Sequence, residues 1–199
     1  MGPGVNSFRR GFEGWTHDPP GEILFSNEEV WAREVEMVLD LIKEVDFADP
    51  KVVPVCVMKG GLPFFLDAAA IIEQSTGIVL NGTAVKTETY ANGRTAGRTV
   101  ITYDIPFDIT GKRLIAFEDL SDTNRTGQAL HDHLVGVRGA ASFEMATLLV
   151  KDVPNKVGAD PKWFGFKAPN RWVGGMGADL GNPDYSDDGR AYRSIFAID

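Results

Sequence analysis

Short strand-like apolar runs alternate with helix-like segments along the chain, and this order limits the possible folds more than any other feature. The strand-like runs are rich in β-branched residues, whereas apolar residues in the longer segments suit helices. The alternating segments are 51–57, 59–76, 112–118, 126–138 and 143–150. Because strands and helices in this order build βαβ units, the sequence predicts an α/β fold with a mostly parallel, twisted sheet flanked by helices.

Segments outside this pattern are also assigned from the sequence. Ser26 and Glu29 have capping-box spacing at the start of an amphipathic helix predicted over 26–47. The glycine-containing stretch 91–98 is expected to form a flexible loop. Further strands are predicted at 78–90 (interrupted at 81–82), 99–104, 163–166, 172–173 and 194–198.

Charge and cysteine usage argue against several classes of function. The 199-residue chain carries a net charge of −8 and has no dense run of Lys and Arg, which disfavours nucleic acid or an anionic membrane as the main partner. No apolar run approaches the roughly 20 residues of a membrane span. Cys56 is the only cysteine, so an internal disulfide is impossible and a reducing compartment is expected. The sequence thus predicts a soluble, cytoplasmic protein.

The segment "LIAFEDLSDTNRTGQAL" (114–130) carries the strongest functional signal. A strand that runs into a polar turn and opens a helix is a common anion site, although an Asp/Thr helix cap without a ligand explains residues 121–127 equally well. Glu118 and Asp119 favour a ligand, because adjacent carboxylates at the end of a buried strand are costly unless something binds them. A phosphate site beside two acids indicates a ribose 5-phosphate.

Three polar turns are expected to meet at one edge of the predicted sheet. In parallel sheets, sites lie beyond the carboxyl ends of the strands. The turns that would gather there are Lys59-Gly60-Gly61, the stretch 118–126 and Lys151.

The segment "LIAFEDLSDTNRT" resembles the signature of type I phosphoribosyltransferases. Four further blocks resemble the hypoxanthine–guanine phosphoribosyltransferases and occur in order: "VCVMKGGLPFFLDAA", "KTETYANG", "ATLLVKDVP" and "VGADPKWFGFKAPNRWVGGMGAD". The resemblance implies the type I phosphoribosyltransferase fold with a small C-terminal hood. It covers 22–199 as a single domain, with a core at about 45–155 and a hood mainly at 156–199, after a flexible N-terminal arm at 1–21.

The resemblance also implies an activity and its partners. A 5-phosphoribosyl group would pass from phosphoribosyl pyrophosphate to N9 of a 6-oxopurine, hypoxanthine or guanine, in purine salvage. Mg²⁺ would neutralise the charge of the leaving pyrophosphate. The partners would be these small molecules and further copies of the chain, in a homodimer or homotetramer, with no nucleic acid and no membrane.

Site residues carry over from the resemblance position by position. Asp122 would be the general base near N7 of the purine, and Glu118 and Asp119 would hold the ribose hydroxyls. The remaining positions are Asp122, Thr123, Asn124, Arg125 and Thr126 for the 5-phosphate, Lys59 and Gly60 for pyrophosphate after a cis Met58–Lys59 peptide, Lys151, Trp172, Val173 and Asp179 for the purine, and Asp179, Glu118 and Asp119 for the metal.

A mobile lid is implied as well. Water would trap the oxocarbenium-like ribose carbon, so the site must close during the reaction. The stretch 89–98 has the composition of a lid, with Thr89 and Tyr90 at its hinge. An ordinary exposed hairpin is the alternative for this stretch.

Two positions depart from the family pattern. Asn124 stands where the family has Gly; Asn tolerates positive φ, which leaves open whether its side chain crowds the phosphate. Ser186 lies close to the place of an Arg that binds pyrophosphate, so either Arg190 replaces that Arg or pyrophosphate binds more weakly. A non-catalytic nucleotide sensor on the same fold is therefore the second hypothesis. An unrelated mononucleotide-binding α/β protein is a third, against which the Glu118-Asp119 pair argues.

Overall fold

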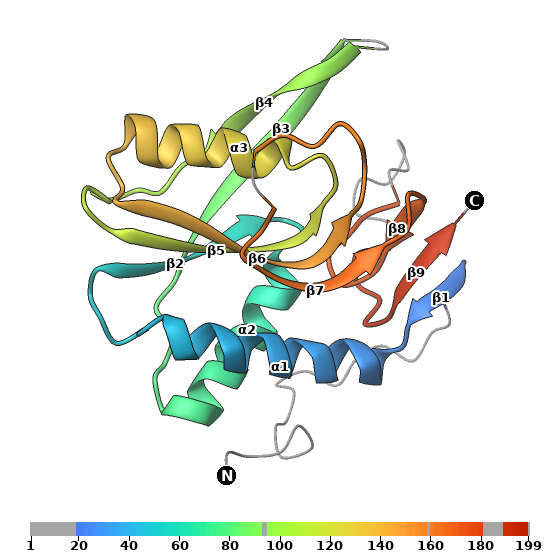
Figure 1. The fold of residues 1–199 in the computed structure, drawn as a ribbon, viewed down its shortest axis with the longest axis horizontal. Coiled ribbons are helices and arrows are strands. Elements are labelled where there is room, and N and C mark those ends of the chain that lie inside the picture. Colours follow the sequence, from blue (N-terminus) through green and yellow to red (C-terminus); the bar gives the residue numbers. More distant parts are fainter. Residues whose placement is uncertain (1–18, 93–94, 159, 181–188, 199) are drawn as a thin grey trace.

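The structure, a computed structural model, describes residues 19–92, 95–158, 160–180 and 189–198, without the side chains of 89–98 (Figure 1). Of the arm predicted at 1–21, residues 1–18 lie outside this description. Within it, a six-stranded sheet has the order β4-β3-β2-β5-β6-β7. Its strands are β2 (Val52–Met58), β3 (Thr83–Asn92), β4 (Thr95–Tyr103), β5 (Arg113–Ser121), β6 (Ser142–Lys151) and β7 (Trp163–Ala168). All neighbours pair in parallel except β3 and β4, which confirms the predicted fold class.

Helices cover both faces of this sheet. They are α1 (Asn27–Glu44), α2 (Leu62–Thr76), α3 (Arg125–His131) and a π-helix (Asp132–Val137) that continues α3. Figure 1 shows α1 and α2 on one face and α3 on the other. The predicted capping box is present at the start of α1, where Ser26 and Glu29 exchange hydrogen bonds.

Alternation along β5 explains why both faces are covered. Side chains of successive strand residues point to opposite faces. Ile115 and Phe117 pack into a core cluster with α1 and α2, whereas Leu114 and Ala116 pack with the residues of α3 and the π-helix. A strand that is apolar on both faces is what a parallel sheet between two helical layers requires.

A small three-stranded antiparallel sheet, the hood, lies beside the end of the large sheet at which β2, β5 and β6 terminate. Its order is β1 (Glu22–Phe25), β9 (Ile195–Ile198) and β8 (Trp172–Gly174). The sequence had not predicted β1. A buried ion pair of 2.5 Å between Arg193 of the hood side and Asp67 of α2 ties the hood to the core.

Some segment predictions need correction. β7 belongs to the large sheet, although the predicted hood at 156–199 would include it, and we therefore propose a hood made of β1, β8 and β9. Of the stretch expected to be a flexible loop at 91–98, the described residues 91–92 and 95–98 belong to β3 and β4, whose pairing extends to Asn92 and Thr95. The strand predicted at 78–90 begins at Thr83, and the helix predicted at 126–138 changes to π geometry after His131. Hydrogen bonding between β3 and β4 keeps residues 91–92 and 95–98 in strands, although their glycine content favours a loop.

Phe117 provides a test of this packing. Its ring is fully buried and meets the edges of Phe64 and Phe65, each with ring centroids 5.5 Å apart. Phe117→Ala should lower the free energy of unfolding by about 3–5 kcal/mol, through lost transfer energy and the cavity left behind. Urea unfolding followed by circular dichroism measures the loss. Leu66→Ala, at an exposed position of α2, is the control and should change it by at most about 0.5 kcal/mol; a loss of that size in Phe117→Ala would contradict the packing.

Candidate active site

The polar turns expected at the carboxyl ends of the strands do meet, in one cavity of about 460 Å³ between the large sheet and the hood. Ten predicted site residues line it: Lys59, Gly60, Glu118, Asp119, Asp122, Thr126, Lys151, Trp172, Val173 and Asp179. The first seven come from the turn after β2, from the last part of β5 with the turn and helix that follow it, and from the end of β6, and the hood supplies the last three. Convergence of this many predicted residues from four separate segments identifies the cavity as the candidate active site.

The turn after β2 forms one wall and has room for no side chain at Gly60. A Cβ atom on Gly60 would overlap the carboxylate of Asp119, which lies near the end of β5. Gly177 of the hood, at φ +99°, packs against the carbonyl oxygen of Gly60 with equally little space. The peptide between Met58 and Lys59 is cis, as predicted. Gly177 therefore allows backbone contact between the hood and the turn after β2, and Gly60 allows that turn to lie against the Asp119 side chain.

Glu118 and Asp119 lie next to each other at the end of β5. The Asp119 N–H donates to Glu118 Oε1 at 3.2 Å, and Glu118 is only 7% exposed. Burial, assisted by the hydrogen bond and charge of Asp119, raises the pKa of Glu118 well above its usual value. Cys56 of β2 is buried, and that burial, together with the two carboxylates, raises its pKa to about 12. The environment thus opposes further negative charge and suits hydroxyl donors or a cation.

Asp122 and Lys151 form the polar centre of the cavity. Lys151 is the last residue of β6 and is 6% exposed, yet its Nζ atom lies 3.3 Å from Asp122 Oδ2. The Asp122 side chain is about half exposed. The buried ammonium of Lys151 can donate a hydrogen bond to one ligand atom. The accessible carboxylate of Asp122 can accept a proton from the neighbouring ligand atom.

The predicted phosphate-binding turn lines an adjoining cavity of about 170 Å³. Thr123, Asn124 and Arg125 face this second cavity, which shares Glu118, Asp122 and Thr126 with the first. Asn124 has φ 56°, the left-handed conformation that its residue type tolerates. The family's glycine position therefore keeps a glycine-like backbone in this chain.

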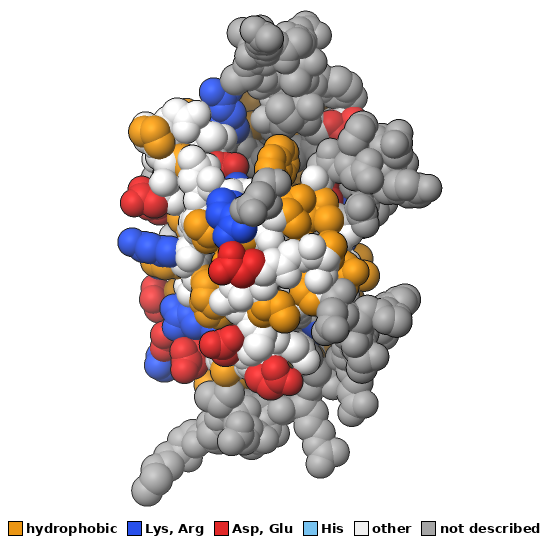
Figure 2. Space-filling model, turned by 90° about the vertical axis from the view of Figure 1, so that its right-hand side faces the viewer, with side chains coloured by type: hydrophobic (Ala, Val, Ile, Leu, Met, Phe, Trp, Pro, Cys, Tyr) orange, Lys and Arg blue, Asp and Glu red, His pale blue; other side chains and the backbone are white. Residues whose placement is uncertain are grey.

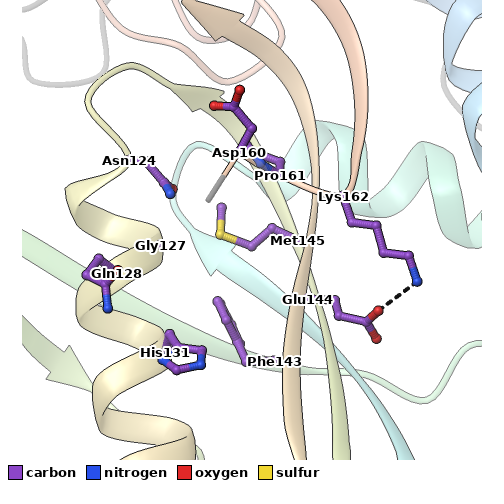
Figure 3. A pocket seen from close by; sticks show the side chains of 10 residues that line it. All are labelled: Asn124, Gly127, Gln128, His131, Phe143, Glu144, Met145, Asp160, Pro161 and Lys162. Atoms are coloured by element: carbon purple, nitrogen blue, oxygen red, sulfur yellow. Dashed lines mark hydrogen bonds and ion pairs between the residues drawn. The ribbon is translucent and has the colours of Figure 1, made fainter. Parts of the chain in front are cut away.

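A third cavity, of about 270 Å³, lies behind α3 and is shown in Figure 3. Its walls come from α3, from the start of β6 (Phe143, Glu144 and Met145) and from the stretch 160–162. It shares Asn124, Gly127 and Met145 with the cavity at the phosphate-binding turn, and none of its lining residues lines the main cavity. It therefore lies next to the phosphate-binding turn and apart from the main cavity.

The hood supplies both an exposed aromatic ring and a cation. Trp172 is 61% exposed on the edge strand β8 and lines the main cavity. Arg190 also lines it and donates to Asp179 Oδ2 and to the Gly177 carbonyl oxygen. Ser186 lies outside the described residues. A basic residue soon after the hood aspartate was the sequence signal for Arg190, and the structure places this residue in the cavity.

Other residues of the cavity escaped the sequence reasoning. Thr87 of β3 and Leu120 of β5 line it, and although both fall in segments that resemble the family, no role was predicted for either. The proposed lid hinge, Thr89 and Tyr90, continues the strand of Thr87, but these two side chains lie outside the described part of the chain.

Charge on the hood end of the molecule is mixed. Figure 2 shows acidic, basic and apolar side chains interspersed on this face, among the residues that the structure describes. Within that part of the chain, no helix is long and apolar enough to span a membrane, and no group of three or more His, Cys, Asp or Glu side chains is arranged to hold a metal ion.

The parallel sheet, the hood and the acid-rich turn define a phosphoribosyltransferase of the type I fold. No family model matches the chain. It is 32% identical over 153 residues to the hypoxanthine-guanine phosphoribosyltransferase of Pan troglodytes, covering 74% of this chain and 69% of that protein. The Streptococcus thermophilus enzyme of that name is 31% identical over 159 residues, covering 79% and 84%. A hypoxanthine phosphoribosyltransferase structure from Trypanosoma cruzi superposes with a TM-score of 0.77 at 24% identity, over 92% of this chain and 94% of that one. The chain belongs to the hypoxanthine-guanine phosphoribosyltransferase family, whose members are enzymes.

The raised pKa of Glu118 gives a test by pH. The folded state holds the proton of Glu118 at pH values where the unfolded state has released it, so this group lowers stability progressively as pH rises above its ordinary pKa. Glu118→Gln keeps the shape but cannot ionise, so at pH 8 it should raise the free energy of unfolding by roughly 0.5–2 kcal/mol. At pH 4 the gain should largely vanish. Thermal melts from pH 4 to 8 measure it, and a gain independent of pH would contradict this origin.

Proposed function

We propose that the protein transfers the 5-phosphoribosyl group of phosphoribosyl pyrophosphate to N9 of a 6-oxopurine, hypoxanthine or guanine. The products are the nucleoside 5′-monophosphate and pyrophosphate, in purine salvage. The observation that carries the proposal is the Asp122–Lys151 pair, whose side-chain atoms lie 3.3 Å apart. This pair lies in the cavity that Glu118 and Asp119 of β5 also line. Family membership supports the same reaction.

The purine would lie between the Asp122–Lys151 pair and the hood. N7 and O6 lie on the same edge of a 6-oxopurine. O6 accepts hydrogen bonds, and N7 carries a proton in the tautomer whose N9 is free to attack. The Lys151 ammonium can only donate, so it suits an oxygen at C6 better than an amino group. Asp122 would take a proton at N7 as N9 attacks the ribose. Trp172 would stack on the base, and the backbone of Val173 would contact its other edge.

The ribose phosphate would occupy the cavity space near the end of β5. Glu118 and Asp119 would accept hydrogen bonds from the ribose hydroxyls. These hydroxyls are neutral, so they can donate to the closely spaced pair of acids without adding charge to it. Asp122 and Thr126 border both cavities, so the turn 122–126 would hold the 5-phosphate beside the purine. This arrangement fixes the distance between the base and the sugar phosphate.

Pyrophosphate would lie against the turn after β2. Lys59, Gly60 and Arg190 line that side, and Arg190 would take the place of the family's arginine. Asp119 and Asp179 offer the hard carboxylate oxygens that Mg²⁺ prefers, and this ion is commonly bound by one or two carboxylates together with substrate phosphates. When bound, Mg²⁺ would neutralise charge on the leaving group.

The β3–β4 hairpin would close over the site. Figure 1 shows it projecting beyond α3, and its strand β3 places Thr87 in the cavity. Bending at Thr89 and Tyr90 would bring the rest of the hairpin over the ribose and exclude water.

We also propose that the protein acts in the cytoplasm as a homodimer or homotetramer. A nucleotide sensor is disfavoured, since the cavity retains both Asp122 and Lys151.

Asp122→Asn tests the role of the general base. With Mg²⁺ and phosphoribosyl pyrophosphate, the wild-type protein should convert hypoxanthine or guanine to the nucleotide, and the variant's kcat should fall by roughly 10²- to 10⁴-fold. The absorbance change on nucleotide formation measures the rate. Asp132→Asn, at an exposed carboxylate of the π-helix, should leave it unchanged. A wild-type protein that binds nucleotide tightly but turns over no base would favour the sensor.

Arg190→Ala tests the replacement of the family's arginine. Loss of the cation should raise KM for phosphoribosyl pyrophosphate and weaken product inhibition by pyrophosphate, each roughly tenfold, since charged hydrogen bonds are worth about 1.5–3 kcal/mol. Arg138→Ala, which breaks an Arg–Asp pair outside the cavity, is the matched control. Equal effects on KM for purine and for phosphoribosyl pyrophosphate would point to a general change of the hood instead.

A further inference from the structure

Asn124 makes a contact that a glycine at its position could not make. Its side chain is largely buried, and its Nδ2 atom donates to the Val157 carbonyl oxygen at 3.0 Å. In return, the Val157 N–H donates to the carbonyl oxygen of the preceding residue, Thr123, also at 3.0 Å. Two hydrogen bonds thus join residues 123–124 to residue 157, which lies 33 positions further along the chain.

The local structure is built to receive the Asn124 side chain. A Cβ atom on Gly127 would overlap Asn124 Oδ1, so the first turn of α3 leaves room for the amide. The Ser121 hydroxyl donates weakly to the same oxygen, at 3.5 Å. Gly158, at φ +65°, turns the chain directly after Val157, where a side chain would overlap Gln128. Figure 3 shows Asn124 at the end of α3 that faces Asp160 and Pro161.

The segment 152–158, which we call the latch segment, is also the continuation of β6 beyond Lys151. Two residues of the proposed phosphate turn are therefore held by this part of the chain: Asp122 by Lys151, and Asn124 by Val157. An ion pair of 2.7 Å joins Lys156 of the latch segment to Asp160, which lies just beyond its end. The phosphate turn and the strand that carries the purine-binding lysine are thus fixed relative to each other.

We propose that Asn124 is a positioning residue that locks the phosphate turn to the latch segment before substrate binds. The inference rests on the proposed function, and it adds that the 5-phosphate meets a turn already held in its binding conformation. Because the amide is engaged with Val157, Asn124 acts from beneath the turn and does not crowd the anion. Holding a loop in its bound conformation improves affinity by reducing the ordering that binding requires.

Asn124→Gly tests the proposal, because glycine adopts the same backbone conformation without strain and removes only the side chain. KM for phosphoribosyl pyrophosphate should rise roughly 3- to 10-fold, the effect of one lost hydrogen bond, with kcat within about twofold. Asn81→Gly is the matched control, since Asn81 is exposed and lies before the start of β3. This is the end of the sheet at which the parallel strands begin, opposite to the cavity. An unchanged or lowered KM in Asn124→Gly would overturn the proposal, and a lowered KM would show that the side chain crowds the phosphate.

Hydrogen exchange separates this proposal from the proposed function. In the ligand-free protein, the amides of the latch segment, including that of Val157, should exchange at least about threefold faster in Asn124→Gly than in the wild type or Asn81→Gly. If the wild-type protein turns over no base, the proposed function fails and the latch is judged by exchange alone. Faster exchange then upholds the latch, and unchanged exchange overturns it.

Discussion

Close backbone contact around Gly60 is the constraint on which the cavity depends. The turn after β2 lies against the side chain of Asp119, near the end of β5, and against the backbone of Gly177 in the hood, and side chains at Gly60 or Gly177 would collide with these neighbours. The parallel sheet brings the ends of β2 and β5 side by side, because the two strands pair in register from Val52 and Arg113 onward. Glycine then allows the hood to close over them. The cavity is therefore a product of the sheet's topology together with two positions that tolerate no side chain.

Charge is distributed unevenly within this frame, and the imbalance defines what the cavity can hold. Asp122 is paired with Lys151 and Asp179 with Arg190, so each of these carboxylates meets a cation. Glu118 and Asp119 instead lie beside each other, and burial raises the pKa of Glu118. Like charges in a buried place are costly, and hydroxyl donors or a cation relieve that cost. A sugar diol with an associated divalent ion therefore fits the part of the cavity where these two carboxylates lie together.

Much of the fold and site was predictable because the signals were local. Short apolar runs that alternate with helix-like segments identified β2, β5 and β6. The topology of a parallel sheet then placed Lys59, Asp119 and Lys151 together. Contacts distant in sequence left no such signal. The β1 strand forms only because β9 pairs with it, and the hairpin strands extend into a glycine-containing stretch because each supports the other. Thr87 reaches the cavity through the register of β3, and the resemblance of the segment 86–93 did not single out this side chain.

The position of Asn124 shows the same distinction between local and distant causes. Its backbone conformation was predictable, since asparagine is the residue other than glycine that best tolerates positive φ. Its function depends on Val157, which no local pattern connects to it. Glycine in this place leaves more conformational freedom in the unbound turn, and that freedom is lost when an anion binds. Asparagine removes part of this freedom during folding, through a hydrogen bond to the segment that follows Lys151. The departure from the family pattern thus moves the ordering of the phosphate turn from the binding step to the folding step, while the backbone that contacts the ligand keeps its shape.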